Sequence, residues 1–318
     1  MKKEQYKYVK ETIETFTQDH PTGVIILRWA TATGKTSLSL ELAKNFDIEI
    51  ISADSRQIYT QMDVGTDKID AITREQVPHH MIDIIHPDQT YTAGQWKAEV
   101  EGLVDEIHAR GKIPVIVWWT WLYIDMLYKN FNMPDVAPDQ EWRDVMEKRE
   151  AQEPGYLFKE LQKVDPNEAM KHHPNSTRYV LRALEIYTKT GTPKSELAKE
   201  LPVKRPLLMV GLRREKEDTN RRINKRIKEM LANWALIQEN KALLEKWYTL
   251  EHTAMNGIWY KEVVWFINGE YNLDRCEELM KRNTHRYAKR QRSRFRRYIM
   301  DSKARPKENV QYVLIELS

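Results

Sequence analysis

A buried strand that runs straight into a glycine-lysine-threonine turn constrains the fold of this chain most. Residues 23–27, GVIIL, form a continuous apolar run, which is typical of a strand buried in a parallel sheet. The next loop ends in Thr33-Gly34-Lys35-Thr36, and helical sequence follows at 37–46. In a phosphate-binding loop (P-loop), backbone N–H groups and a helix N-terminus point at phosphate oxygens. The plainer alternative is a strand-to-helix turn with a surface lysine.

We predict that this loop binds phosphate groups. Lys35 would reach the terminal phosphate, and the hydroxyl of Thr36 would bind Mg²⁺, the one cofactor we expect. The usual pattern, G-x-x-x-x-G-K-[ST], requires glycine where this chain has Trp29. The predicted phosphate-binding residues are Trp29, Ala30, Thr31, Ala32, Thr33, Gly34, Lys35 and Thr36.

Further apolar runs predict the rest of the sheet. They lie at 48–55, at 112–120 after a helix at about 94–110, and at 206–212. Strands that alternate with helices predict an α/β fold, here a P-loop NTPase-like parallel sheet flanked by helices. Because ligands of such sheets bind at the carboxyl ends of the strands, one crevice could hold the residues that follow them. These residues are Lys35, Thr36, Asp54 and Thr120.

Asp54 has two readings from its spacing alone. A carboxylate facing a P-loop can hold the water shell of a metal or act as a general base. Aspartate at such a junction is also a common helix N-cap.

Changes in composition and in secondary-structure pattern along the chain predict its domains. We expect a helical N-terminal extension at 1–20 and the first part of the core at 21–128. A Pro-rich connection then opens an all-helical insertion domain at 129–204. Residues 205–318 would complete the core and add a basic helical C-terminal region.

Composition excludes several classes of protein. The single cysteine, Cys276, rules out a disulfide framework and a zinc site of cysteines. The paired histidines at 79–80 and 172–173 lack the pattern of a zinc site, so we interpret them as structural or as RNA contacts. Without an apolar run of signal-peptide or membrane-span length, we expect a cytoplasmic protein with no membrane contact.

The segment 281–297, KRNTHRYAKRQRSRFRR, is the strongest charge signal. It has nine Lys or Arg and no acidic residue, and Tyr287 and Phe295 interleave with them. A solvated helix usually mixes charges of both signs, so this segment favours contact with nucleic-acid phosphates.

Several blocks together resemble the tRNA dimethylallyltransferase (tRNA isopentenyltransferase) family. They follow the order of that family over most of residues 23–300. The blocks are ATATGKTSLSLELA, ISADSRQIYTQMDVGTDK, VPHHMIDI, PVIVWWTWLYID, HPNSTRYVLRALEIYTKTG, TNRRINKRI, GIWYKEVV and YAKRQRSRFRR. The resemblance implies transfer of a dimethylallyl group from its diphosphate to N6 of adenosine 37, beside the anticodon of certain tRNAs.

The resemblance also implies roles for individual residues. Asp54 would be the base, and Arg222 would lie near the diphosphate, with Arg226 as the fallback. The implied catalytic set is Asp54, Lys35, Arg222 and Thr120. The implied partner is the tRNA anticodon stem-loop, clasped in part by the insertion, and we expect a monomer. The implied tRNA contacts are Asp54, Ser55, Arg56, Gln57, Thr120, Thr177, Arg178, Lys289, Arg290 and Arg292.

Departures from the family pattern share one form, tryptophan in place of glycine. The chain has 10 tryptophans and only 11 glycines, whereas average usage of about 7% predicts roughly twice as many glycines. Our hypothesis is that UGA codons meaning glycine have been translated as tryptophan. The candidates are Trp29, Trp118, Trp119, Trp121 and Trp259, with Trp234 a weaker one. Trp96, Trp142 and Trp247 lie in helical sequence and look genuine, and Trp265 is left unassigned.

Three other functions stay open at this point. The chain could be a small-molecule kinase, or a prenyltransferase that acts on free AMP. If the tryptophans are real, it could be an RNA-binding homologue that has lost catalysis.

Overall fold

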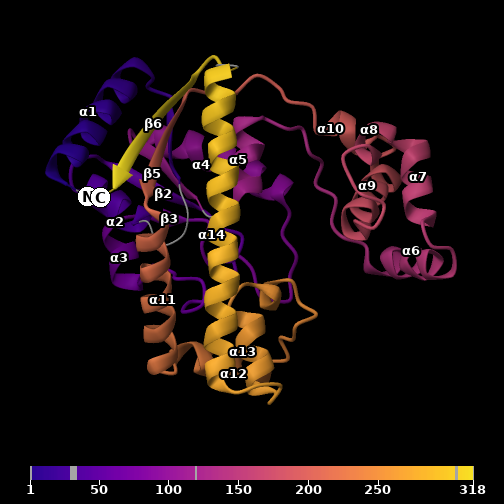
Figure 1. The fold of residues 1–318 in the computed structure, drawn as a ribbon. Coiled ribbons are helices and arrows are strands. Elements are labelled where there is room, and N and C mark those ends of the chain that lie inside the picture. Colours follow the sequence, from indigo (N-terminus) through magenta and orange to yellow (C-terminus); the bar gives the residue numbers. More distant parts are fainter. Residues whose placement is uncertain (1, 29–33, 119, 305–306, 318) are drawn as a thin grey trace. The chain divides into compact units, whose positions relative to one another are not determined.

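The computed structural model describes residues 2–28, 34–118, 120–304 and 307–317. At its centre lies a parallel sheet of six strands in the order β3-β2-β4-β1-β5-β6 (Figure 1). The strands are β1 (Val24–Arg28), β2 (Ile48–Ala53), β3 (His79–His80), β4 (Ile113–Trp118), β5 (Leu207–Arg214) and β6 (Val310–Leu317). The predicted parallel sheet is confirmed. β3 and β6, the two edge strands, were not predicted.

The chain separates into two compact units. The first consists of residues 1–89, 99–124 and 203–318, and the second of residues 90–98 and 125–202. The insertion predicted at 129–204 therefore overlaps most of the second unit, which also takes in a short stretch before it. That stretch includes the start of helix α4 (Ala93–Ala109).

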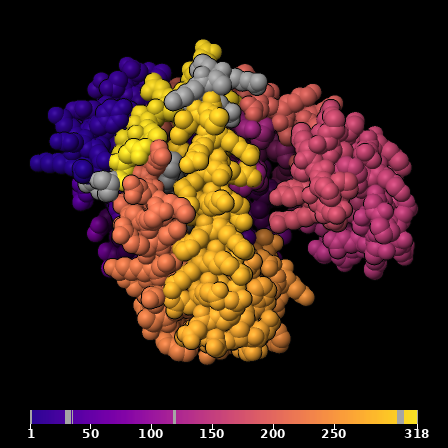
Figure 2. All heavy atoms as spheres, viewed as in Figure 1, coloured from indigo at the N-terminus to yellow at the C-terminus, as the bar shows by residue number. Residues whose placement is uncertain are grey.

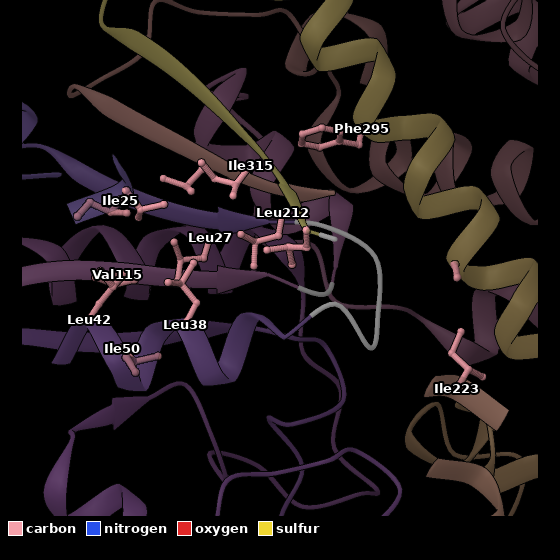
Figure 3. Packing of buried hydrophobic residues seen from close by; sticks show 14 of the residues in the cluster. Ile25, Leu27, Leu38, Leu42, Ile50, Val115, Leu212, Ile223, Phe295 and Ile315 are labelled. Atoms are coloured by element: carbon pink, nitrogen blue, oxygen red, sulfur yellow. The ribbon is translucent and has the colours of Figure 1, made fainter. Parts of the chain in front are cut away.

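Helices of the first unit pack on the sheet and on one another. In Figure 3, Leu38 and Leu42 from one helix lie by Leu27 and Val115 of the central strands, within one buried cluster. The helices are α1 (Lys3–Asp19), α2 (Lys35–Ala43), α3 (Ala71–Gln76), α11 (Lys216–Ala232), α12 (Ala235–Glu245), the short 3-10 helix η1 (Ala254–Asn256), α13 (Tyr260–Ile267) and α14 (Leu273–Ala304). Helix α5 (Trp121–Tyr128) continues into the second unit.

Helix α1 is part of the core, whereas the sequence suggested an appendage. Val9, Ile13 and Phe16 lie on its inner face and are at most 1% exposed. At Gly23 a side chain would come within 2.6 Å of the Phe16 ring, so this glycine allows the helix to pack against the start of β1.

Helix α14 runs past the sheet as a long ridge, exposed along one side (Figure 2). Its Phe295 packs so closely on β5 that a side chain at Gly211 would come within 2.4 Å of the ring. Helices α11 and α13 also pack against α14. The basic segment predicted from the sequence therefore belongs to a helix anchored by its own apolar residues.

The second unit has its own apolar core, built from helices. Leu157, Leu161, Val180 and Leu184 are buried in it, and Trp142 packs against them. Its helices are α6 (Gln140–Gln152), α7 (Tyr156–Val164), α8 (Pro166–Ala169), α9 (Thr177–Thr190) and α10 (Lys194–Leu197). The predicted all-helical character of this region is confirmed.

Candidate functional site

A cavity of about 330 Å³ lies at the carboxyl ends of β2 and β4. This volume is at the lower end of the range of small-molecule sites in proteins. Residues from the strand ends, from the segment before α13 and from α14 share it. Its lining consists of Asp54, Ser55, Arg56, Gly65, Thr66, Thr120, Trp121, Asn256, Gly257, Ile258, Trp259, Thr284, Tyr287 and Arg290.

Hydrogen bonds between the two strand ends fix the polar wall of the cavity. The N–H of Thr120 donates to the carbonyl of Ala53 at 2.9 Å, as if the ladder between β2 and β4 continued. The N–H of Ser55 donates to the hydroxyl of Thr120 at 2.9 Å, and that hydroxyl donates to Ser55 Oγ at 3.0 Å. Because these bonds cross between neighbouring strands, the sheet itself sets the positions of both side chains.

Asp54 is 5% exposed and lines the cavity. Its Oδ1 accepts from the N–H of Arg56 at 2.8 Å, which makes an Asx turn. Turn residues follow it and the next helix begins only at Ala71, so the helix N-cap alternative is wrong.

Tyr287 shares the cavity with Asp54. Burial, and next the charge of Asp54, raises the pKa of the Tyr287 phenol above its ordinary value of 10.0. Tyr287 is therefore a neutral hydrogen-bonding group at physiological pH.

Gln57 lies apart from the main cavity. Its Oε1 accepts from the hydroxyl of Ser52 at 2.8 Å, and its amide donates to the carbonyl oxygens of Thr66 and Asp67 at 3.1 and 3.3 Å. It lines a smaller cavity of about 40 Å³ together with Thr36 and Asp67. Its side chain thus holds the loop at 66–67 in place.

The predicted diphosphate loop is described only at its end. Trp29, Ala30, Thr31, Ala32 and Thr33 lie outside the described residues, as does the side chain of Lys35. Gly34 is the N-cap of α2 with a φ of 99°, a conformation that glycine adopts without strain. Thr36 is exposed in the first turn of α2.

The two arginines considered for the diphosphate differ in their surroundings. Arg222 is exposed on α11. Arg226 is half-buried, pairs with Asp67 at 2.7 Å and lies with its guanidinium 4.9 Å from the ring centroid of Trp259. Burial lowers the pKa of Arg226, while the charges of Asp67 and Asp54 oppose this shift. Arg226, the fallback choice, therefore lies within electrostatic range of Asp54.

The three predicted basic contacts on α14 have different exposures. Lys289 and Arg290 are exposed, and Arg290 also lines the main cavity. Arg292 is half-buried, and burial lowers its pKa. Its buried Nη1 has no hydrogen-bond partner among the described residues, as expected for a group that binds an anion.

Within the second unit, Thr177 and Arg178 begin helix α9. Arg178 is exposed and Thr177 half-buried. The neighbouring Tyr179 is 57% exposed and stacks on His172, with 5.2 Å between ring centroids. An exposed helix N-terminus beside an aromatic ring and an arginine is suited to binding phosphate and base groups.

Glu239 is a functional candidate that the sequence gave no reason to suspect. Its carboxylate accepts from the N–H groups of Asp63 and Val64, each at 2.7 Å, and of Gly65 at 3.1 Å. It also accepts from the Tyr260 hydroxyl at 2.6 Å. Because Gly65 lines the cavity, this partly buried network ties α12 to the cavity wall.

The paired histidines are occupied by protein contacts. His80 lies 2.6 Å from Glu49, and His172 lies 3.2 Å from Glu168. Among the described residues no group of three or more His, Cys, Asp or Glu could hold a metal ion. The interpretation of these histidines as structural agrees with their contacts. No helix in the described part of the chain is both long enough and apolar enough to cross a membrane.

Comparison with known proteins connects this geometry to one family. The family model described as IPP transferase matches residues 57–298, and the model for isopentenyl transferase matches residues 22–76. The tRNA dimethylallyltransferase of Halothermothrix orenii is 44% identical over 284 residues, which cover 88% of this chain and 86% of that protein. The enzyme of the same name from Thermotoga maritima is 40% identical over 275 residues, covering 86% of this chain and 90% of that protein.

Solved structures agree with the sequence comparison. The tRNA isopentenylpyrophosphate transferase of Bacillus halodurans superposes with a TM-score of 0.63 at 35% identity, covering 92% of this chain and 90% of that one. A eukaryotic dimethylallyltransferase acting on tRNA superposes with a TM-score of 0.74 at 30% identity, covering 91% and 73%.

Proposed function

Because the chain belongs to the IPP transferase family, the tRNA dimethylallyltransferases, we propose that it transfers a dimethylallyl group from dimethylallyl diphosphate to N6 of adenosine 37 in tRNA. The observation that carries this proposal is the cavity at the strand ends, in which Asp54, Thr120 and Arg290 meet. A carboxylate, a hydroxyl and a cation bordering an apolar cavity suit a purine with an adjoining phosphate backbone.

In the proposed reaction, N6 of the adenine attacks C1 of the dimethylallyl group. The bond from C1 to the bridging oxygen breaks, and pyrophosphate leaves with that electron pair. Asp54 accepts the proton that N6 loses. The adenine amino group is a weak nucleophile, so a buried carboxylate beside it gives general-base assistance, worth typically about 10²–10⁴-fold.

The leaving diphosphate needs positive charge and N–H donors. We propose that the end of the P-loop with Lys35, together with Arg222 or Arg226, provides them. A positioned cation stabilises charge in the transition state more than in the ground state, which is what accelerates the reaction.

Magnesium fits the residues present. Thr36 lines its small cavity together with Ser52, Gln57 and Asp67, all of which have side-chain oxygens, and oxygen donors are the ligands that Mg²⁺ prefers. Bound there with the substrate phosphates, the ion would neutralise charge on the leaving group. Thr36 is the residue that we propose as its ligand.

We propose that α14 and the second unit bind the anticodon stem-loop. Lys289, Arg290 and Arg292 would bind phosphates, and Thr177 and Arg178 would contact the RNA from the start of α9. Adenosine 37 would have to leave its stack to reach Asp54, which is the usual solution for chemistry on a base. We also propose that the protein acts in the cytoplasm and as a monomer.

The test is a prenylation assay with Mg²⁺, dimethylallyl diphosphate and a tRNA carrying adenosine at 36 and 37. We expect N6-isopentenyladenosine in digested tRNA from a protein with glycine at 29, 118, 119 and 121. A tRNA with guanosine at 37 is the matched control, and AMP tests the free-nucleotide alternative. Absence of product from the glycine-restored protein would contradict the proposal.

A further inference from the structure

Three tryptophans have a backbone conformation that belongs to glycine. The φ angles of Trp234, Trp247 and Trp259 are 57°, 68° and 83°. Only a few per cent of non-glycine residues have positive φ, mostly Asn and Asp, and a bulky residue there is an outlier. Eight of the ten tryptophans have a described backbone, so three outliers among them far exceed that frequency.

Trp247 closes α12 by a motif that the chain elsewhere builds with glycine. Its N–H donates to the carbonyl of Leu244, and the N–H of Tyr248 donates to that of Leu243. This is a Schellman motif, and its left-handed residue is usually glycine because a Cβ is disfavoured there.

Two glycines of the same chain provide the comparison. Gly111 and Gly269 end α4 and α13 with the same pair of backbone bonds and with φ of 73° and 79°. The indole of Trp247 is 85% exposed, so little packing compensates for the conformation. The sequence suggested a genuine tryptophan in a helix here. That interpretation is wrong, because α12 ends at Glu245 and Trp247 lies after the helix.

Trp234 makes the first of these two backbone bonds and lies at the corner between α11 and α12 (Figure 1). It is the N-cap of α12 in the left-handed conformation, its N–H donates to the carbonyl of Leu231, and its indole is 48% exposed. The hydrogen bonds at both corners are made by the main chain, so glycine would keep them.

Trp259 differs because its indole is buried in the candidate site. With φ 83° and ψ −43° it lies near a γ-turn conformation that is strained for residues with a Cβ. Its N–H donates to Glu262 at 2.7 Å, a bond that glycine would also make. The indole Nε1 donates to Thr284 Oγ1 at 2.8 Å, and the ring lies against Arg226. Glycine here would leave Thr284 and Arg226 facing the cavity.

We infer that the protein made in its own cell carries glycine at 234, 247 and 259, and that the codons there are UGA read as glycine. This inference extends the sequence-based hypothesis of misread glycine codons to Trp247 and strengthens it at Trp234. For Trp259 it adds the positive φ as physical support. Trp96, Trp142 and Trp265 lie within helices and keep tryptophan. Trp29 and Trp119 lie outside the described residues.

The direct test is the mass of one tryptic peptide from the natively produced protein. Cleavage after Lys246 and Lys261 releases residues 247–261, which carry two of the three positions. We expect glycine at 247 and 259 and UGA in the gene. The peptide with tryptophan at both positions, or UGG codons, overturns the inference.

A second test uses stability and needs no enzymatic activity. In the full chain, Trp247→Gly should raise the unfolding midpoint by about 2–4 °C, the shift expected for relief of one left-handed non-glycine residue. The mirror variant Gly269→Trp should lower the midpoint. Trp142→Gly should lower it as well, because Trp142 packs against the apolar core of the second unit. An unchanged or lower midpoint for Trp247→Gly contradicts the inference.

Discussion

Two buried carboxylates lie near opposite ends of β2 and differ in their surroundings. Glu49, near the start of β2, is 3% exposed, and Asp54, just past its end, is 5% exposed. Polar partners surround Glu49: Arg110 donates two bonds at 3.0 and 2.7 Å, and His80 Nε2 lies at 2.6 Å. Lys112 adds its charge at 3.4 Å. Asp54 instead borders a cavity large enough for a ligand.

The difference shows that burial of an acidic residue does not identify a catalytic site. Bidentate hydrogen bonds from Arg110 come first among the causes that lower the pKa of Glu49 to about 2. A carboxylate saturated in this way holds the sheet edge together and has no capacity left for a substrate. The cavity beside Asp54, at the carboxyl ends of the strands, is what makes it a candidate base.

The largest expected effect is a loss of activity on changing Asp54, which would distinguish this carboxylate from Glu49. Asp54→Asn keeps the shape of the side chain and removes its basicity, so we expect kcat for prenyl transfer to fall by about 10²–10⁴-fold. The measurement is single-turnover formation of modified tRNA. If the unfolding midpoint falls as far as it does for Glu49→Gln, Asp54 is structural and the comparison fails.

Glu49→Gln should act on stability, by an amount on the order of 2 kcal/mol, because it leaves the surrounding cations without their carboxylate. The folded pKa of about 2 lies below the ordinary 4.5, so Glu49 stabilises the fold above about pH 4.5. That contribution is lost as the pH falls toward 2. Urea unfolding at pH 7 and pH 3 should therefore show a smaller gap between wild type and variant at the lower pH. A gap that grows on acidification would contradict the assignment.

Glu239 sharpens the comparison, because it is a structural carboxylate that also shapes the cavity. Glu239→Gln weakens charge-assisted bonds to the loop at 63–65, so we expect KM for tRNA or dimethylallyl diphosphate to rise by up to about tenfold. We expect kcat to change less. Tyr260→Phe, which removes only the phenol donor to Glu239, is the matched control and should have a smaller effect. A loss confined to kcat would place Glu239 with Asp54 instead.

The smallest effects are expected on the exposed face of α14. Lys289→Ala and Arg290→Ala should each weaken tRNA binding a few-fold and reduce the slope of log affinity against log salt by about 1. Fluorescence anisotropy with labelled tRNA over a KCl series measures this slope. Lys7→Ala, an exposed lysine of α1, is the control and should leave the slope unchanged. Equal slopes for all three variants would remove α14 from the proposed tRNA surface.

Periodicity and motif made the central strands, the P-loop helix and the basic helix predictable. β1 is apolar from Val24 to Leu27 and buried throughout, so its sequence alone indicates a central parallel strand. β3 has only two residues, too few for any periodicity to show. β6 pairs along its whole length with β5, although only Ile315 and Leu317 of its eight residues are buried, which is why its sequence gave no such signal.

The sequence by itself assigned Asp54 and Thr120 to a candidate site, because both follow predicted strands and ligands of a parallel sheet bind where its strands end. It also determined the family, through blocks that keep their order along the chain. Only the tertiary structure decided which buried carboxylate faces a cavity, because hydrogen-bond partners such as Arg110 and the loop at 63–65 come from distant segments. The backbone angles at Trp234, Trp247 and Trp259 likewise depend on how helices end and turn. Trp247, which the sequence suggested was genuine, therefore became recognisable as a glycine position only because the fold gave it a positive φ.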